Sequence, residues 1–147
     1  MSNQLLAAIG TAVVGGLIAL QAPINSGLGK TIGTFPAAAF SFIIGTLVLV
    51  GIVLVKGDAG SVSGVVDVKA QYLIGGLLGA AYVTTVLVTV RTLGAGGVTA
   101  ATVAGQLTAA VIIDRLGILG LEGKPITLGR VLGVLLLFAG TLLVIRA

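Results

Sequence analysis

Five long apolar runs, separated by short polar stretches, set the strongest limit on how this chain can fold. A helix that crosses a bilayer needs about 20 apolar residues, because the hydrocarbon core is about 30 Å thick and a helix rises about 1.5 Å per residue. The runs predict membrane-spanning helices at residues 4–29, 36–55, 71–92, 97–115 and 125–145. We therefore expect an all-α polytopic membrane protein in which residues 1–147 form one transmembrane domain.

Composition supports a lipid environment and removes several classes of chemistry. Only 8% of the residues are charged, and the mean hydropathy is +1.25, whereas a soluble domain has about 25% charged residues. The chain has no Cys and no His, which excludes disulfides, thiol or imidazole catalysis and the usual zinc sites. No cofactor, metal site or catalytic residue is expected, and an enzyme is the least favoured class. The Lys and Arg residues are scattered singly, which does not indicate nucleic-acid binding.

A proline and two amides lie in the second half of the first run. Pro23 has no N–H, which frees the carbonyl of Ala19, so we expect the helix to break there. Gln21 and Asn25 are four residues apart and share one face, with Ser26 beside them. Polar groups in hydrocarbon are costly, so these side chains are candidates for a transport pathway. Alternatively, the segment from Gln21 onward is only the interfacial end of an ordinary span.

The third and fourth runs also carry polar side chains. Tyr82 and Thr85 share a face, although transmembrane threonines often bond a carbonyl of their own helix. Tyr82 lies away from the interfacial belt where membrane tyrosines are common, so its hydroxyl needs a partner inside the bundle. Gln106 has no local partner for its amide, and Asp114 either faces the interior or marks the interface beside Arg115. Neutral amides favour an uncharged or zwitterionic solute, with Asp114 the one acidic candidate for proton coupling.

The basic residues divide almost evenly between the two sides of the membrane. With five spans, the N-terminal side of the membrane receives five of them: Lys56, Lys69, Arg115, Lys124 and Arg130. The opposite side receives three: Lys30, Arg91 and Arg146. This is a weak preference for a cytoplasmic N-terminus, and a chain so evenly charged can insert both ways. Two opposite copies would form an inverted-repeat transporter. We further expect the Arg130 guanidinium to extend back to the lipid headgroups.

Small residues and a short glycine-rich segment predict how the helices pack. The segment RTLGAGG is too short to be more than a turn, so the third and fourth helices are expected to form an antiparallel hairpin. Small side chains four positions apart let transmembrane helices approach closely. Such stripes are Ala37, Ser41 and Gly45; Gly75 and Gly79; Gly97, Ala101, Gly105 and Ala109; and Gly129 and Gly133.

Three segments carry a resemblance to a known family: QAPINSGLGKTIGTFPAAAFSFIIGTLVLV, GQLTAAVIIDRLGILG and GKPITLGRVLGVLLLFAGTLLV. Together they resemble the YdcZ family of short bacterial membrane proteins, part of the drug/metabolite transporter (DMT) superfamily, over essentially the whole chain. The resemblance implies half of a ten-helix DMT-like bundle in the bacterial inner membrane, completed by an oppositely oriented homodimer partner or a paired paralogous subunit. It carries over Gln21, Asn25, Gln106 and Asp114 as motif positions. The first helix has no glutamate, which argues against the cation–proton exchange of the small multidrug-resistance transporters.

The expected function is that of an alternating-access carrier or exporter of a small polar solute, working as an antiparallel dimer in the lipid bilayer. The predicted transport pathway contains Gln21, Asn25, Ser26, Tyr82, Thr85, Gln106 and Asp114, with the helix break at Pro23. Two alternatives are a dimeric channel with a narrow polar pore and a membrane assembly subunit that transports nothing.

Overall fold

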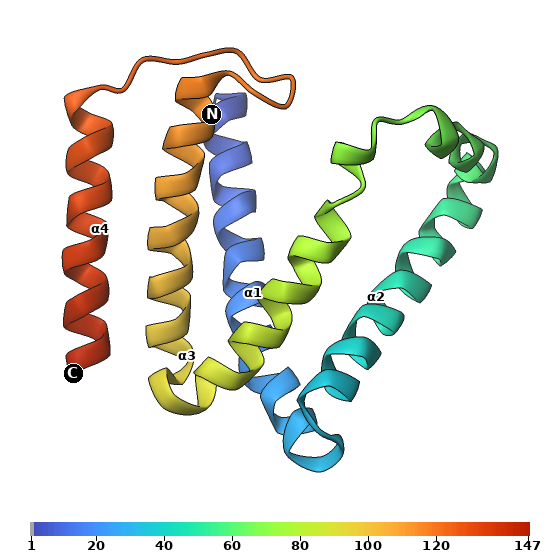
Figure 1. Ribbon diagram of the computed structural model, residues 1–147, viewed down its shortest axis with the longest axis horizontal. Coiled ribbons are helices and arrows are strands. Elements are labelled where there is room, and N and C mark those ends of the chain that lie inside the picture. Colours follow the sequence, from blue (N-terminus) through green and yellow to red (C-terminus); the bar gives the residue numbers. More distant parts are fainter. Residues whose placement is uncertain (1) are drawn as a thin grey trace. The chain divides into compact units, whose positions relative to one another are not determined.

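The computed structural model describes residues 2–147, and every regular element in that range is a helix. The α-helices are α1 (Asn3–Ile32), α2 (Thr34–Lys56), α3 (Gly75–Leu116) and α4 (Leu128–Arg146) (Figure 1). Two 3-10 helices, η1 (Asp58–Asp67) and η2 (Ala70–Tyr72), lie between α2 and α3. All four α-helices are long and apolar enough to cross a membrane. The all-helical membrane fold predicted from the sequence is therefore confirmed.

Helix α3 contains one break in its helical geometry. Gly94 has φ 67° and ψ 171°, a conformation that favours glycine, and it separates a first segment at 75–93 from a second segment at 95–116. Each segment is roughly 30 Å long at about 1.5 Å per residue, close to the thickness of the hydrocarbon core. The expected turn RTLGAGG is thus reduced to one non-helical residue, and the two predicted helices are joined in α3.

The connection between α1 and α2 is tighter than the sequence predicts. Helix α1 continues past the expected end at residue 29 to Ile32, and α2 begins at Thr34, so Gly33 alone separates them. Gly33 has φ 94°, which a residue with a Cβ rarely adopts, and its N–H donates to the carbonyl of Gly29 at 3.0 Å. One glycine therefore makes a turn for which the sequence suggested a longer loop.

Helix α1 also corrects the expected break at Pro23. The helix is continuous from Asn3 to Ile32, with Pro23 inside it. Proline removes only one backbone donor, and the residues after it keep helical geometry. The polar side chains near Pro23 are consequently presented by an intact helix.

Two other helices begin later than expected. The third predicted helix starts at Gly75 rather than at 71, because η2 occupies residues 70–72. Helix α4 starts at Leu128 rather than at 125, because Thr127 caps it: the Thr127 hydroxyl accepts a hydrogen bond from the backbone N–H of Arg130 at 3.3 Å. This cap fixes Arg130 in the first turn of α4.

The residues up to Arg91 form one compact unit, and Thr92–Ala147 form a second. In the first unit, Ala37 and Ala38 of α2 pack with Val83 and Leu87 of the first α3 segment, and Tyr82 packs against this cluster. Ala37, which belongs to the predicted stripe of small residues, therefore allows close helix packing, and Ala38 beside it contributes to the same cluster.

The second unit is held together by a buried threonine. The Thr141 hydroxyl, which is 7% exposed, is hydrogen-bonded to the carbonyl of Leu137 in its own helix at 2.8 Å and to the carbonyl of Ala100 at 3.1 Å. Gly97 adds a close approach, because a Cβ there would lie 3.4 Å from Cγ1 of Ile145. These contacts join α4 to the second segment of α3.

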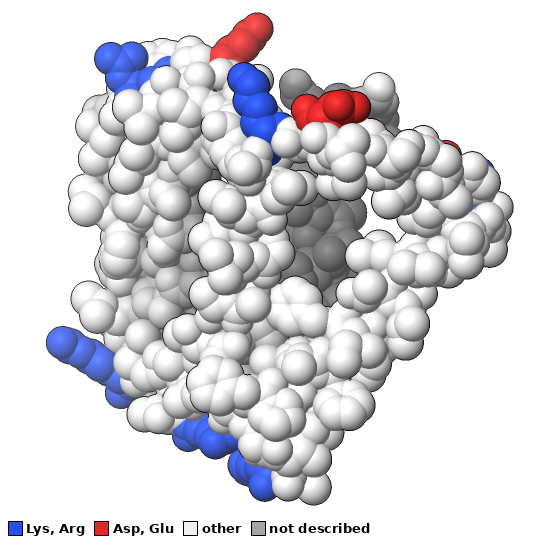
Figure 2. Space-filling view, turned by 45° about the vertical axis from the view of Figure 1, so that its right-hand side comes forward, with Lys and Arg blue, Asp and Glu red and all other residues white. Residues whose placement is uncertain are grey.

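The surface of the helices between their ends is apolar. Large aliphatic side chains such as Leu47, at 65%, and Leu136, at 72%, are widely exposed. In Figure 2 the charged side chains lie at the ends of helices, and the surface between them is almost uniformly uncharged. Such a surface is stable in contact with lipid or another apolar helix, whereas in water it would promote aggregation.

Candidate functional site

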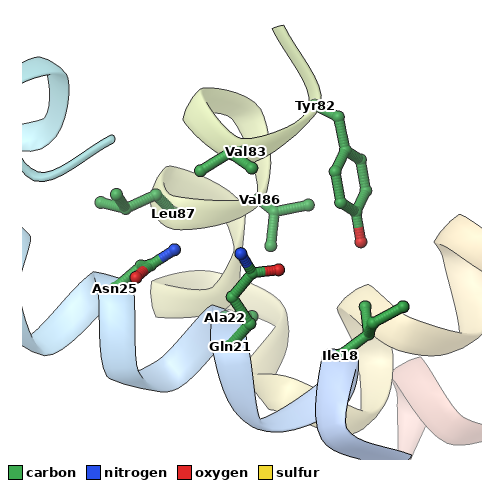
Figure 3. A pocket seen from close by; sticks show the side chains of 8 residues that line it. All are labelled: Ile18, Gln21, Ala22, Asn25, Tyr82, Val83, Val86 and Leu87. Atoms are coloured by element: carbon green, nitrogen blue, oxygen red, sulfur yellow. The ribbon is translucent and has the colours of Figure 1, made fainter. Parts of the chain in front are cut away.

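Helix α1 and the first segment of α3 enclose a small cavity in the first unit. Its volume is about 10 Å³, which is roughly the space for one water molecule. The polar lining comes from Gln21, Asn25 and Tyr82, and the apolar lining from Ile18, Ala22, Val83, Val86 and Leu87. Figure 3 shows the two amide side chains extending from α1 toward α3, while the Tyr82 ring extends from α3 toward α1. The structure therefore brings three of the predicted site residues together.

A larger cavity lies beside the first one, between α1 and α2. Its volume is about 250 Å³, and its lining is Gln21, Ser41, Phe42, Gly45, Thr46 and Leu49. Gln21 thus lies on both cavities. Ser41 and Gly45 belong to the stripe of small residues, and the absence of bulk at these positions leaves this space open. We call Gln21, Asn25, Ser41, Thr46 and Tyr82 the Gln21 site.

Asn25 is the most constrained side chain of this site. It is 7% exposed, and its Nδ2 donates a hydrogen bond to Oγ of Ser41 at 3.2 Å. A buried amide without a partner would be costly, so Ser41 stabilises the position of Asn25 and links α1 to α2. Asn25 is therefore packed between helices, whether this stretch lies inside the membrane or at the interfacial end of its span.

Ser26 has a different set of contacts. It is 5% exposed, and its Oγ accepts a hydrogen bond from Nε of Arg91 at 3.3 Å. Ser26 lines neither cavity of the Gln21 site. Its contact instead ties α1 to the end of the first α3 segment, which indicates a structural role.

Two other predicted residues lie outside these cavities. Thr85 is exposed, and the local bond expected of transmembrane threonines is made instead by Thr89, whose hydroxyl donates to the Thr85 carbonyl at 3.0 Å. Gln106 lies at the middle of the second α3 segment and is exposed, and its side-chain amide has no hydrogen bond within residues 2–147. An unpartnered amide at that depth in a membrane needs a polar group from elsewhere.

Asp114 is engaged by a residue that the sequence did not pair with it. Its Oδ2 lies 3.1 Å from Nη2 of Arg130, and the two side chains are 31% and 29% exposed. The Arg130 guanidinium, which we expect to extend toward the lipid headgroups, thus also pairs with Asp114. The cap at Thr127 and the hydrogen bond from the Lys124 N–H to the Asp114 carbonyl, at 2.7 Å, hold the start of α4 near the end of α3. The sequence did contain a signal for this pair, because Asp114 lies within one turn of the end of one span and Arg130 within one turn of the start of the next.

These observations define the class of protein: a polytopic helical membrane protein with polar side chains gathered inside its apolar spans. A family described as "Putative inner membrane exporter, YdcZ" matches residues 6–143. The chain belongs to this YdcZ family of the drug/metabolite transporters, as the resemblance of its motifs predicts. It is accordingly an inner-membrane protein of an exporter family, and a transporter rather than an enzyme. No curated protein and no solved structure gives a significant match.

Proposed function

We propose that the protein exports a small, uncharged or zwitterionic polar solute by alternating access, and that the solute binds at the Gln21 site. The observation that carries this proposal is the position of Gln21 on two adjacent cavities. All polar side chains lining those cavities are amides or hydroxyls, and none is a carboxylate. Such groups recognise hydroxyls, amides and similar polar groups by hydrogen bonding and offer no counter-ion to a cation.

The size of the two cavities limits the solute. Pockets for drug-sized ligands are about 300–1,000 Å³, and the larger cavity here is about 250 Å³. The smaller cavity, about 10 Å³, holds one water at most in this conformation. We infer that the solute enters beside α2 and that Tyr82 contacts it only after α1 and α3 move apart. A solute of modest size suits this arrangement better than a large amphiphilic drug.

The working unit in this proposal is a dimer of oppositely oriented chains, each with five crossings. Two features support it. The segments of α3 on either side of Gly94 are each long enough to cross the hydrocarbon core. Gln106 is exposed in the middle of one of them, where a second chain would supply its missing partner. The even division of basic residues permits both orientations.

A ligand panel tests the proposed class of solute. The purified protein would be heated in detergent with polyols, sugars and amino acids, and separately with the lipophilic cation tetraphenylphosphonium. A neutral or zwitterionic solute at about 100 times its Kd should stabilise the folded state by about 2.7 kcal/mol, a shift of several degrees in Tm. Stabilisation by the cation with none by any neutral or zwitterionic solute would contradict the proposal.

A further inference from the structure

A third cavity, in the second unit, combines a charged pair with an apolar wall. Its volume is about 300 Å³, and Asp114 and Arg130 both line it. The remaining lining is Leu107, Ala110 and Val111 of α3, and Gly129 and Gly133 of α4. We call it the Arg130 cavity. None of its lining residues belongs to the Gln21 site, so an inference about it does not rest on the proposed function.

The charged pair in this cavity leaves hydrogen-bonding capacity on both partners. One guanidinium nitrogen, Nη2, contacts one carboxylate oxygen, Oδ2, at 3.1 Å. The other nitrogen, Nη1 of Arg130, is buried and has no hydrogen-bond partner in the described part of the chain. The Asp114 side chain is 31% exposed. A bidentate pair would have used Nη1 as well, whereas this single contact leaves Nη1 unpaired and closed off in this conformation, so that a ligand reaches it only when the Arg130 side chain turns it toward the cavity.

We propose that the Arg130 cavity binds a zwitterion that carries an ammonium group and an anionic phosphate or carboxylate. The anionic group would accept from Arg130 after that side chain turns Nη1 toward the cavity, and the ammonium group would donate to the partly exposed Asp114 carboxylate. A purely anionic ligand would meet the Asp114 carboxylate, and a purely cationic ligand would meet the Arg130 guanidinium, so a ligand with both charges complements the pair best. The aliphatic wall would contact the ligand's hydrocarbon portion.

This chemistry has two possible sources at a membrane. Phosphatidylethanolamine presents an ammonium and a singly charged phosphate diester on acyl chains, and water-soluble glycerophosphoethanolamine presents the same groups without them. Asp114 and Arg130 lie within one turn of the ends of their helices, the depth at which a lipid headgroup is found. Phosphatidylglycerol presents a phosphate without an ammonium group and therefore tests the role of Asp114.

The glycines of α4 provide a variant that fills the cavity and leaves the charged pair in place. A Cβ at Gly133 would have no protein atom within 4 Å, so a larger side chain there projects into open space. Gly133→Leu should thus occupy the Arg130 cavity without a clash. Gly140→Leu is the matched control, because Gly140 is also in α4, also has nothing within 4 Å, and does not line the cavity.

The test measures the Tm of the full-length protein in detergent with each of the three compounds. Stabilisation by phosphatidylethanolamine, by glycerophosphoethanolamine or by both is the expected result, with an affinity for phosphatidylglycerol at least about tenfold weaker. Stabilisation by phosphatidylethanolamine alone assigns a lipid, stabilisation by glycerophosphoethanolamine alone assigns a soluble zwitterion, and stabilisation by both shows that the headgroup is the part recognised. The stabilisation should be lost in Gly133→Leu and kept in Gly140→Leu. Equal stabilisation by phosphatidylglycerol, no stabilisation by either zwitterion, or an effect unchanged by Gly133→Leu would overturn the proposal.

Discussion

Gln21→Leu is expected to weaken solute binding by on the order of 10- to 100-fold while the protein stays folded. Leucine is similar in size but removes the donor and the acceptor that face both cavities of the Gln21 site. A hydrogen bond lost in a desolvated site costs about 1–3 kcal/mol, and each 1.4 kcal/mol is a factor of ten in affinity. The expected loss would be measured with the solute that gives the largest Tm shift in the ligand panel.

The fold should tolerate this substitution, which is what makes it informative. Gln21 is exposed and its side chain forms no hydrogen bond with other residues in the range 2–147, so the loss of the amide leaves no protein group unpaired. Gln4→Leu, at the start of the same helix and outside both cavities, is the matched control and should bind as the unmodified protein does. Normal binding in Gln21→Leu would exclude Gln21 from the site.

Gly29→Val is expected to destabilise the first unit by about 1–3 kcal/mol, the usual cost of overpacking. A Cβ at position 29 would lie 2.6 Å from Cδ2 of Leu87 and 3.0 Å from Nη2 of Arg91. Leu87 is fully buried, and the cavity of about 10 Å³ that it lines leaves its side chain little space to move into. The substitution should therefore push α1 away from the first segment of α3 and disturb the contact between Arg91 and Ser26.

A second glycine in α1 supplies the comparison for this effect. A Cβ at Gly27 would have nothing within 4 Å, so Gly27→Val makes the same change in helix propensity without the clash. The Tm of the two variants in detergent would be compared. A Tm for Gly29→Val equal to that of Gly27→Val would show that α1 and α3 do not pack as described.

The membrane-spanning helices could be predicted from the sequence because hydropathy and length alone determine whether a helix can cross a bilayer. Their boundaries depended on finer effects. Gly33, with φ 94°, turns the chain in a single residue, and Thr127 delays the start of α4 by capping it. Pro23 was expected to break α1, but losing one donor was not enough to interrupt a helix that long.

The candidate site was predicted only in part. Gln21, Asn25 and Tyr82 stood out because amides and a mid-span hydroxyl are rare in hydrocarbon, and the structure places all three on one cavity. Ser41 was noticed only as a small residue, because its bond to Asn25 depends on how α1 and α2 pack. Among the glycines of α1, Gly29 makes the closest approach to α3, but it does not belong to any of the predicted stripes of small residues. Its contact with Leu87 could not be predicted because the two residues are distant in sequence.

The central claim, that chains insert in both orientations and pair antiparallel, can be tested by labelling single cysteines. The chain has no Cys, so each introduced thiol is the only reactive one. Ser61 in η1 and Thr92 near the Gly94 break are exposed and suit substitution by Cys. Gly57 and Gly94 are unsuitable because their φ values of 76° and 67° would strain a residue with a side chain.

Membrane-impermeant maleimide would be applied to intact spheroplasts and to inverted vesicles that contain Ser61→Cys or Thr92→Cys. With five crossings, these two positions lie on opposite sides of the membrane in any one chain. We predict that each cysteine is labelled in both preparations, because half of an antiparallel homodimer presents each position to each face. Labelling of Ser61→Cys from one face only, and of Thr92→Cys from the other face only, would contradict the antiparallel homodimer.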